Sequence, residues 1–243
     1  MPMMAFARRN ARELLRDPLT LFFGLVFPLI LLGLLSLIGL HAPVAMFQIE
    51  SLAPGIAAFG YSFISLFSAL LVSKDRSSAL MLRLLTSPLR PRDFILGYIL
   101  PLLPMAVLQS GVCLLAAGLL GMRISWRLPV CMAALFPAAL MYIALGLICG
   151  CLLNDKQVGG VCGALLTNLT AWLSGTWFEI DLLGKGFASL ARVLPFSNAV
   201  EAARLALAGE AAGIGKPLMI VCGYALLLFL AAVGIFARRM RRT

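Results

Sequence analysis

Long uncharged runs of apolar residues alternate along this chain with short segments that carry nearly all of its charge. A bilayer core about 30 Å thick requires roughly 20 apolar residues of helix to cross it. Six runs without Asp, Glu, Lys or Arg reach that length and predict transmembrane helices at approximately 19–40, 52–73, 94–121, 128–153, 158–178 and 217–236. We therefore predict an all-α polytopic membrane protein in which residues 1–243 form a single transmembrane domain.

The composition supports a membrane protein and excludes a soluble domain. Of the 243 residues, 62% are hydrophobic and 12% are charged, too few to cover a wetted surface. All six cysteines fall inside the predicted spans, where neither a disulfide framework nor a metal site is expected, so we interpret them as packing residues. A cleavable signal peptide is the alternative for the first run, but that run is long for a signal core and five more follow it.

The basic residues divide unevenly between the two sides of the predicted domain. The side that holds both termini receives four Lys or Arg in the leader, five in 74–93, Lys156 and four at the C-terminus, which makes 14 of the 20. The other side receives six over a longer total length. By the positive-inside rule, we expect both termini on the cytoplasmic side of the membrane. We expect that membrane to be a bacterial plasma or inner membrane. The net charge of +10 then indicates attraction to anionic lipid heads, with no nucleic-acid partner.

The leader, 1–18, has the pattern of an amphipathic helix that ends at Asp17-Pro18. One face would carry the apolar residues Met4, Ala7, Ala11, Leu14 and Leu15. The other would carry Arg8, Arg9, Arg12, Glu13 and Arg16. We interpret the leader as a helix that lies in the cytoplasmic interface; a frayed tail is the alternative.

The longest loop, 179–216, falls on the extracellular side and is rich in apolar residues. Two short amphipathic patterns, Leu182–Leu194 and Ala199–Leu207, are separated by Pro195, and Ser197 or Asn198 would cap the second. We expect short re-entrant helices that pack against the membrane domain before the last span.

Several kinds of chemistry lack the residues they need. His41 is the single histidine and is interpreted as an interfacial polar residue, so no histidine pair or Ser-His arrangement is available. The phosphate-binding pattern G-x-x-x-x-G-K-[ST] does not occur; the nearest string, Gly213 to Pro217, lacks the hydroxyl residue. No predicted span contains a charged residue that could couple transport to protons or sodium. Energy for uphill transport would therefore come from elsewhere.

Two blocks of the sequence resemble the ABC-2 type permease family. The first, 52–100, has a Pro-Gly start to the second span, a charged exit, the segment "RLLTSPL" and entry into the third span. The second, 174–204, has a small-residue and aromatic exit from the fifth span and the pattern P-x-x-x-A-V-E-A-x-R, which ends at Arg204. Six spans, cytoplasmic termini and an interfacial leader extend the resemblance over nearly the whole chain.

The resemblance implies the membrane subunit of an ABC exporter. Such permeases pair in the membrane as homodimers or with a similar permease, and each couples to a cytoplasmic ABC ATPase subunit, with two ATPase copies per transporter. ATP and Mg²⁺ would be bound by that partner, so no cofactor, metal or catalytic residue is expected in this chain and it would not be an enzyme.

The segment 77–90 corresponds in the family to the coupling helix that docks on the ATPase. Ser77 or Ser78 would cap a short helix that the Ser87-Pro88 step ends. Its expected contact residues are Leu80, Met81, Leu82, Arg83, Leu84, Leu85 and Pro88. A helix that only lies on lipid heads is the alternative.

A substrate path is expected along the second and fifth spans, which line the pathway in the family. Phe59, Phe63 and Phe67 recur every four residues as an aromatic stripe, for which ordinary helix packing is the alternative. Asn168 and Trp172 share a face of the fifth span, the most polar of the six. Such a wall suits an amphiphilic substrate that is drug-, lipid- or glycolipid-like. The sequence does not choose among drugs, lipids, glycolipid or oligosaccharide precursors and peptides. An ion- or proton-coupled secondary carrier or a channel remains the alternative function.

Overall fold

The computed structural model describes residues 2–41, 45–78 and 91–240, and within these ranges the chain is helical and contains no strand. The first half comprises α1 (Pro2–Arg16), α2 (Pro18–Leu21), the π-helix η1 (Phe22–Val26), α3 (Phe27–His41), the 3-10 helix η2 (Ala45–Phe47), α4 (Ile49–Ser77) and α6 (Pro91–Leu119). The second half comprises α7 (Arg127–Leu152), α8 (Asp155–Val158), the π-helix η3 (Gly159–Leu166), α9 (Thr167–Leu173), the 3-10 helix η4 (Ile180–Leu183), α10 (Lys185–Val193), α11 (Pro195–Ala208) and α12 (Ala211–Met240).

Five helical stretches of the described residues are long and apolar enough to cross a membrane. They are Pro18–His41, Ile49–Ser77, Asp93–Leu119, Arg127–Leu152 and Ala211–Arg238, which coincide with five of the six predicted runs. The all-α polytopic fold is therefore confirmed. The remaining run, 158–178, is helical through α8, η3 and α9 and ends at Leu173, so the prediction that it crosses the membrane stays open.

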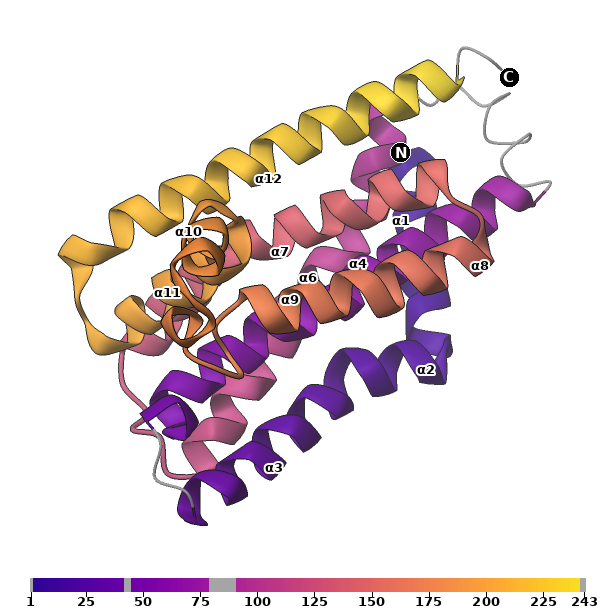
Figure 1. Ribbon diagram of the computed structural model, residues 1–243. Coiled ribbons are helices and arrows are strands. Elements are labelled where there is room, and N and C mark those ends of the chain that lie inside the picture. The colour runs from indigo at the N-terminus through magenta and orange to yellow at the C-terminus, as the bar shows by residue number, and fades with distance from the viewer. Residues whose placement is uncertain (1, 42–44, 79–90, 241–243) are drawn as a thin grey trace.

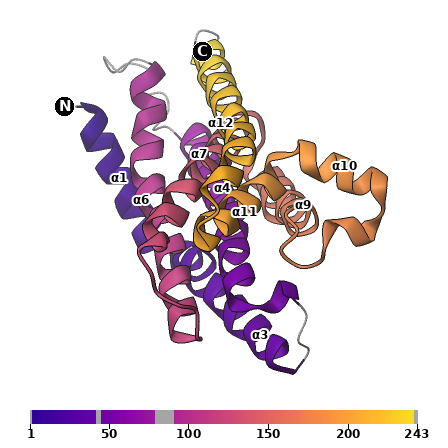
Figure 2. The same cartoon turned by 90° about the vertical axis from the view of Figure 1, so that its left-hand side faces the viewer.

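The long helices form an elongated bundle around α4 (Figure 1). In the most apolar 18-residue stretch of α4, 89% of the residues are buried. The corresponding shares are 22% for Pro18–His41 and 17% for α12, which lie at opposite edges of the bundle in Figure 1. The start of α1 and the end of α12 lie at the same end of the bundle, while α10 projects from its flank beside α9 and α11 (Figure 2). The core is thus built on the second predicted span.

The contact between α4 and α7 is close because glycines on α7 face the backbone of α4. A Cβ atom added to Gly146 would lie 2.2 Å from the carbonyl oxygen of Ser65, and Gly150 repeats this approach one turn later. Beside them, the Ser68 hydroxyl donates to the carbonyl oxygen of Ile143 at 3.1 Å. Small residues of this kind let membrane helices approach closely and gain van der Waals contacts. Burial of apolar surface contributes little between helices in lipid.

The leader is helical and ends as predicted. Asp17 caps α2, because its side chain accepts hydrogen bonds from the Leu19 amide at 3.2 Å and from the Thr20 hydroxyl at 2.7 Å, while Pro18 occupies the first turn. The chain therefore passes from α1 into the first span through a sharp, capped junction.

The face that α1 packs against the bundle only partly coincides with its predicted apolar face. Ala7 and Leu14 are buried as expected, but Met4 and Leu15 are 61% and 66% exposed. The packed face also includes Phe6 and Asn10, which the prediction left out. Helical periodicity identified an amphipathic helix, but the bundle surface that it meets determines which residues are covered.

Short helices lie at both predicted positions in 179–216, as α10 and α11, but they are joined differently. Pro195 lies in the first turn of α11 and Leu194 precedes it, so the prediction that Ser197 or Asn198 would cap this helix is wrong. Instead, the Ser197 hydroxyl donates to the Ala191 carbonyl at 2.6 Å and the Asn198 amide donates to the Leu194 carbonyl at 2.7 Å. Both side chains turn back to satisfy free carbonyl groups around the end of α10, while α11 itself packs against α4, α7 and α12.

The six cysteines are free thiols. Cys222 is exposed on α12, and the other five are buried or partly buried among the helices. This placement agrees with their interpretation as packing residues.

Candidate functional site

The aromatic stripe of α4 is buried against other parts of the same chain. Phe63 stacks on Phe23 of η1, with ring centroids 5.5 Å apart, and meets the edge of Phe27 at 5.4 Å. Phe59 contacts Trp177 edge to face at 5.4 Å. Together with Phe67, the stripe residues are each less than a tenth exposed. Within a single chain, Phe63 therefore packs between the first two spans, and Phe59 packs on the segment that follows α9.

Asn168 and Trp172 lie on an exposed face of the predicted fifth span. The Asn168 amide donates to the Ala164 carbonyl one turn earlier at 2.8 Å, and Trp172 is half exposed, with its ring 4.9 Å from that of Phe178. Gly160 and Ala164 continue the same face at intervals of four residues and are also exposed. The structure therefore separates these two residues from the phenylalanine stripe and does not join them on one wall.

Thr170 and Ser174 of this segment have side-chain hydrogen-bond partners within the chain. Thr170 is buried and shares a hydrogen bond of 3.0 Å with the Tyr142 hydroxyl of α7. The Ser174 hydroxyl donates to that of Thr176 at 2.8 Å. Asn168 differs from these two residues, because it is exposed and, among the described residues, its side chain bonds only to its own helical segment.

The predicted ATPase-contacting residues, Leu80, Met81, Leu82, Arg83, Leu84, Leu85 and Pro88, lie outside the described residues. The described chain reaches them at Ser78 and resumes at Pro91. Ser77 is the last residue of α4, and its hydroxyl donates back to the Lys74 carbonyl at 3.0 Å, while that of Ser78 donates to the Asp75 carbonyl at 2.8 Å.

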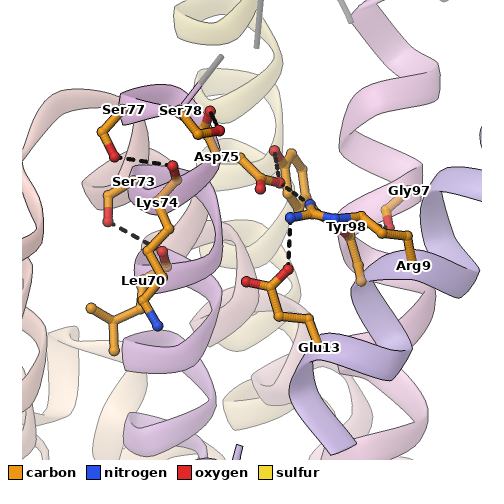
Figure 3. A network of polar contacts seen from close by, with 11 residues as sticks. Arg9, Glu13, Leu70, Ser73, Lys74, Asp75, Ser77, Ser78, Gly97 and Tyr98 are labelled. Carbon is orange, nitrogen blue, oxygen red and sulfur yellow. Dashed lines mark hydrogen bonds and ion pairs between the residues drawn. The ribbon is translucent and has the colours of Figure 1, made fainter. Parts of the chain in front are cut away.

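A network of polar contacts gathers at this end of α4 around Asp75, which is 1% exposed (Figure 3). The carboxylate oxygen Oδ2 accepts a hydrogen bond of 2.6 Å from Nη1 of Arg9 on α1 and one of 3.0 Å from the hydroxyl of Tyr98 on α6. Arg9 also pairs with Glu13, one turn along α1, at 2.7 Å. One buried carboxylate therefore joins three elements.

The Arg9 side chain is 39% exposed, and its charge is matched by Asp75 and Glu13. Partial burial acts to lower the pKa of Arg9, but the hydrogen bond and the charge of Asp75 outweigh it and hold that pKa above its ordinary value. Arg9 therefore stays protonated and keeps the buried carboxylate paired.

The opposite side of the same turn of α4 holds the junction between α7 and α8. Arg76 donates to the carbonyl oxygen of Cys151 and, at 2.7 Å, to that of Leu153, which are among the last carbonyl groups of α7. The Ser73 hydroxyl donates to the Asp155 carboxylate in the first turn of α8 at 2.5 Å. The end of α4 thus contacts α1, α6, α7 and α8 through side-chain hydrogen bonds.

A second polar region lies at the other end of α4. Arg204 of α11 donates from Nε to the Ser51 carbonyl at 2.9 Å and from Nη2 to the Gly175 carbonyl at 3.2 Å. Burial lowers the pKa of Arg204, although Glu201 opposes this effect. Arg204 borders a cavity of about 420 Å³ whose charged lining residues are Glu179, Asp181, Arg192, Glu201 and Arg204. Arg204 closes the family-like pattern noted in the sequence, and its role here is to tie α11 to the start of α4.

Sequence reasoning missed the Asp75 network. Asp75 stood out only as the single acid between Lys74 and Arg76 in a charged exit, and Arg9 was placed on the polar face of the leader. These residues are 66 positions apart, and no local spacing pairs them. Comparison with known proteins adds the family: a sequence model described as ABC-2 type transporter matches residues 2–208, which include every residue discussed in this subsection. No curated protein matches the chain significantly.

Proposed function

The chain belongs to the ABC-2 type transporter family, and on this premise we propose that it is the permease subunit of an ATP-driven exporter that moves an amphiphilic substrate outward. Membership makes the chain a multi-pass transport protein of a family that works with an ATPase partner. Direction, substrate class and the mode of coupling are the proposed parts. ATP and Mg²⁺ would be held by the partner subunit.

We place the chain in a bacterial inner membrane with both termini on the cytoplasmic side. The start of α1 and the end of α12 lie at the same end of the bundle, which requires an even number of crossings (Figures 1 and 2). Counting α8 to α9 as a sixth crossing beside the five long helices satisfies this requirement. The excess of basic residues at that end supports its assignment to the cytoplasm.

The exposed face of η3 and α9 is the observation that carries the transport proposal. An amide in lipid is costly unless protein or water covers it, so Asn168 calls for a partner surface or a hydrated path. Trp172 adds a half-exposed aromatic ring to this face, and Gly160 and Ala164 allow close approach. A second copy of the permease would place two such faces around one path that suits a molecule with both apolar and polar parts.

Phe59, Phe63 and Phe67 are buried, so they belong to this path only if the elements that cover them move away. For Phe63 these are η1 and α3, through Phe23 and Phe27, and for Phe59 it is the segment that carries Trp177. The test uses the permease reconstituted with its ATPase, and stimulation of ATP hydrolysis by two probes, the amphiphilic cation rhodamine 6G and a fluorescent phospholipid. Phe63→Ala and Asn168→Ala should change the stimulation by at least one probe. Phe136→Ala, which removes a ring on the outer face of α7, is the control.

If both variants showed unchanged stimulation of ATP hydrolysis by both probes, Phe63 and Asn168 would have only a packing role. Probe movement that follows an imposed ion gradient and ignores ATP would instead favour a secondary carrier.

We also propose that 77–90 is the segment that contacts the ATPase. Leu82→Asp combined with Leu85→Asp should abolish co-purification with the ATPase, because two carboxylates would have to enter an apolar groove. Leu119→Asp with Leu120→Asp adds the same two charges at the far end of α6, where both side chains are exposed, and should leave the complex intact. Retention of the ATPase by the first variant would refute the assignment.

A further inference from the structure

We propose that Asp75 is a positioning residue that makes α1 and α6 move as one with α4, α7 and α8 when the ATPase acts on the segment between α4 and α6. This inference rests on the proposed function, because it concerns how motion at 77–90 reaches the membrane helices. It assigns a transport role to a side chain outside both the predicted ATPase-contacting segment and the predicted substrate path.

Two groups of elements meet at this end of the bundle. In the first group, α1 is fixed to α6: the Asn10 amide donates to the Gly97 carbonyl at 3.1 Å, and the Phe6 ring packs edge to face on Tyr98 at 5.0 Å and on Phe94 at 5.9 Å. Gly97 has no room for a Cβ atom, which would lie 2.4 Å from the Phe6 ring. Helix α1 therefore follows α6.

In the second group, α4 is fixed to α7 and α8. Arg76 holds the last carbonyl groups of α7, and Ser73 holds the first turn of α8 through Asp155. Along their length α4 and α7 also meet through Gly146 and Gly150, where there is no space between the backbones. A push on α4 is thus delivered to α7 and α8 as well.

Asp75 joins the two groups, and it does so at the point where the chain leaves α4 for the ATPase-contacting segment. Its carboxylate receives Arg9 from α1 and Tyr98 from α6, while its own backbone belongs to α4 (Figure 3). The segment 79–90 runs from one group to the other, so force on it acts between them. While the hydrogen bonds to the Asp75 carboxylate are intact, a displacement of one group of helices also moves the other group.

The burial of Asp75 favours a joint that stays closed through the transport cycle. Loss of Arg9 would leave a carboxylate that is 1% exposed without its ion-pair partner in a low-dielectric environment, which is costly. Arg9 is less constrained, because it is partly exposed and retains Glu13. Asp75→Asn therefore removes the charge that requires the joint to close, while the new amide oxygen can still accept from Tyr98.

The experiment measures distances between spin labels introduced through an unnatural amino acid, so that the native cysteines stay in place. Labels at Arg12 of α1 and Lys156 of α8, both exposed, report on the two groups within one copy when labelled permease is diluted with unlabelled. Labels at Arg12 in both copies report whether ATP moves the permease at all. Each distance is recorded for the permease–ATPase complex without nucleotide and after trapping with ATP and vanadate.

We expect the Arg12–Arg12 distance of the unsubstituted protein to shift on trapping, while its Arg12–Lys156 distance stays constant. In Asp75→Asn, both nucleotide-free distances should be unchanged, but trapping should now alter the Arg12–Lys156 distance and the Arg12–Arg12 shift should be largely lost. Tyr98→Phe keeps the ring contacts and should produce a weaker change in the same direction, and Arg9→Lys, which keeps the charge, should behave as the unsubstituted protein.

Arg192→Gln is the matched control, because Arg192 pairs with Asp181 at the same distance of 2.6 Å but on the exposed outer loop. It should leave every distance unchanged. A constant Arg12–Lys156 distance in trapped Asp75→Asn, or a changing one in the unsubstituted protein, would overturn the proposal. If Asp75→Asn fails to fold, a constant Arg12–Lys156 distance in trapped Tyr98→Phe would overturn the proposal. Loss of ATPase association in the unsubstituted protein would instead count against the proposed function.

Discussion

The closest backbone approach between α4 and α7 makes Gly146→Ala a sharp test of the fold. The added methyl group would lie 2.2 Å from the Ser65 carbonyl oxygen and 2.6 Å from the Ser68 side chain. Ordinary contact begins near 3.4 Å, so α7 would have to withdraw by about 1 Å. Neither clashing group is the end of a flexible side chain, and withdrawal would stretch the hydrogen bond from Ser68 to the Ile143 carbonyl.

Three terms set the expected size of the effect. Replacing glycine by alanine inside a helix stabilises it by about 1 kcal/mol. Overpacking a close contact costs about 1–3 kcal/mol. Loss of the Ser68 hydrogen bond costs about 1 kcal/mol more. Gly146→Ala should therefore lower the free energy of unfolding by about 1–3 kcal/mol, which for a chain of this length corresponds to a fall in melting temperature of about 5 °C.

The native cysteines provide the assay. Cys113, Cys131, Cys151 and Cys162 are buried, so a thiol-reactive fluorescent maleimide reports the temperature at which the bundle opens in detergent. The control is Gly223→Ala on α12, where an added Cβ atom meets nothing within 4 Å and only the gain in helix stability remains. If Gly146→Ala melted at or above Gly223→Ala, the helices would not approach as closely as the structure shows.

Three further substitutions probe other contacts. Gly209 has a φ of +82° at the end of α11, so Gly209→Ala should lower the free energy of unfolding by about 1–2 kcal/mol, with Gly209→Asn affected less, in the same thiol assay. Gln109 is buried and its Oε1 accepts no hydrogen bond within the described residues, so Gln109→Met should leave the melting temperature unchanged or raise it; a clear fall would reveal an unseen partner. A lysine at position 204 cannot reach both the Ser51 and Gly175 carbonyl groups, so Arg204→Lys should loosen the loop 179–216. Trypsin added on the side of this loop should then cleave it faster than in the unsubstituted protein. An unchanged cleavage rate would show that the two bonds do not hold the loop.

The long helices could be predicted from the sequence because the length and polarity of each run respond to the bilayer directly. The second run was predicted as 52–73, whereas α4 extends from Ile49 to Ser77. The added turn contains Asp75 and Arg76, charged residues whose hydrogen bonds to other elements let the helix continue past its apolar core. The span predicted at 158–178 stays a prediction, because Gly-rich and polar residues mix there and the helix ends at Leu173.

The candidate site was less predictable, because its contacts are set by tertiary packing. The four-residue spacing of Phe59, Phe63 and Phe67 correctly indicated one helical face, but the same spacing fits a packed face and a cavity wall, and the single chain shows the packed one. Asn168 and Trp172 do share an exposed face, as their spacing required. No pattern in the sequence could have brought Arg9 to Asp75, since each lies in a charged segment that reads as solvent-facing on its own.

The distribution of polar contacts along α4 suggests how stability and motion are divided in this bundle. The middle of α4 meets its neighbours through small residues, as where Gly146 faces Ser65, and such contacts tolerate little sliding or separation. The two ends also carry side-chain hydrogen bonds to other elements, to Asp75 at the end that precedes residues 79–90 and from Arg204 at the start. These hydrogen bonds transmit movement between neighbouring helices, whereas a close backbone contact acts as a pivot. Substitutions at the middle of α4 should therefore change stability, and substitutions at its ends should change how the helices on either side move relative to each other.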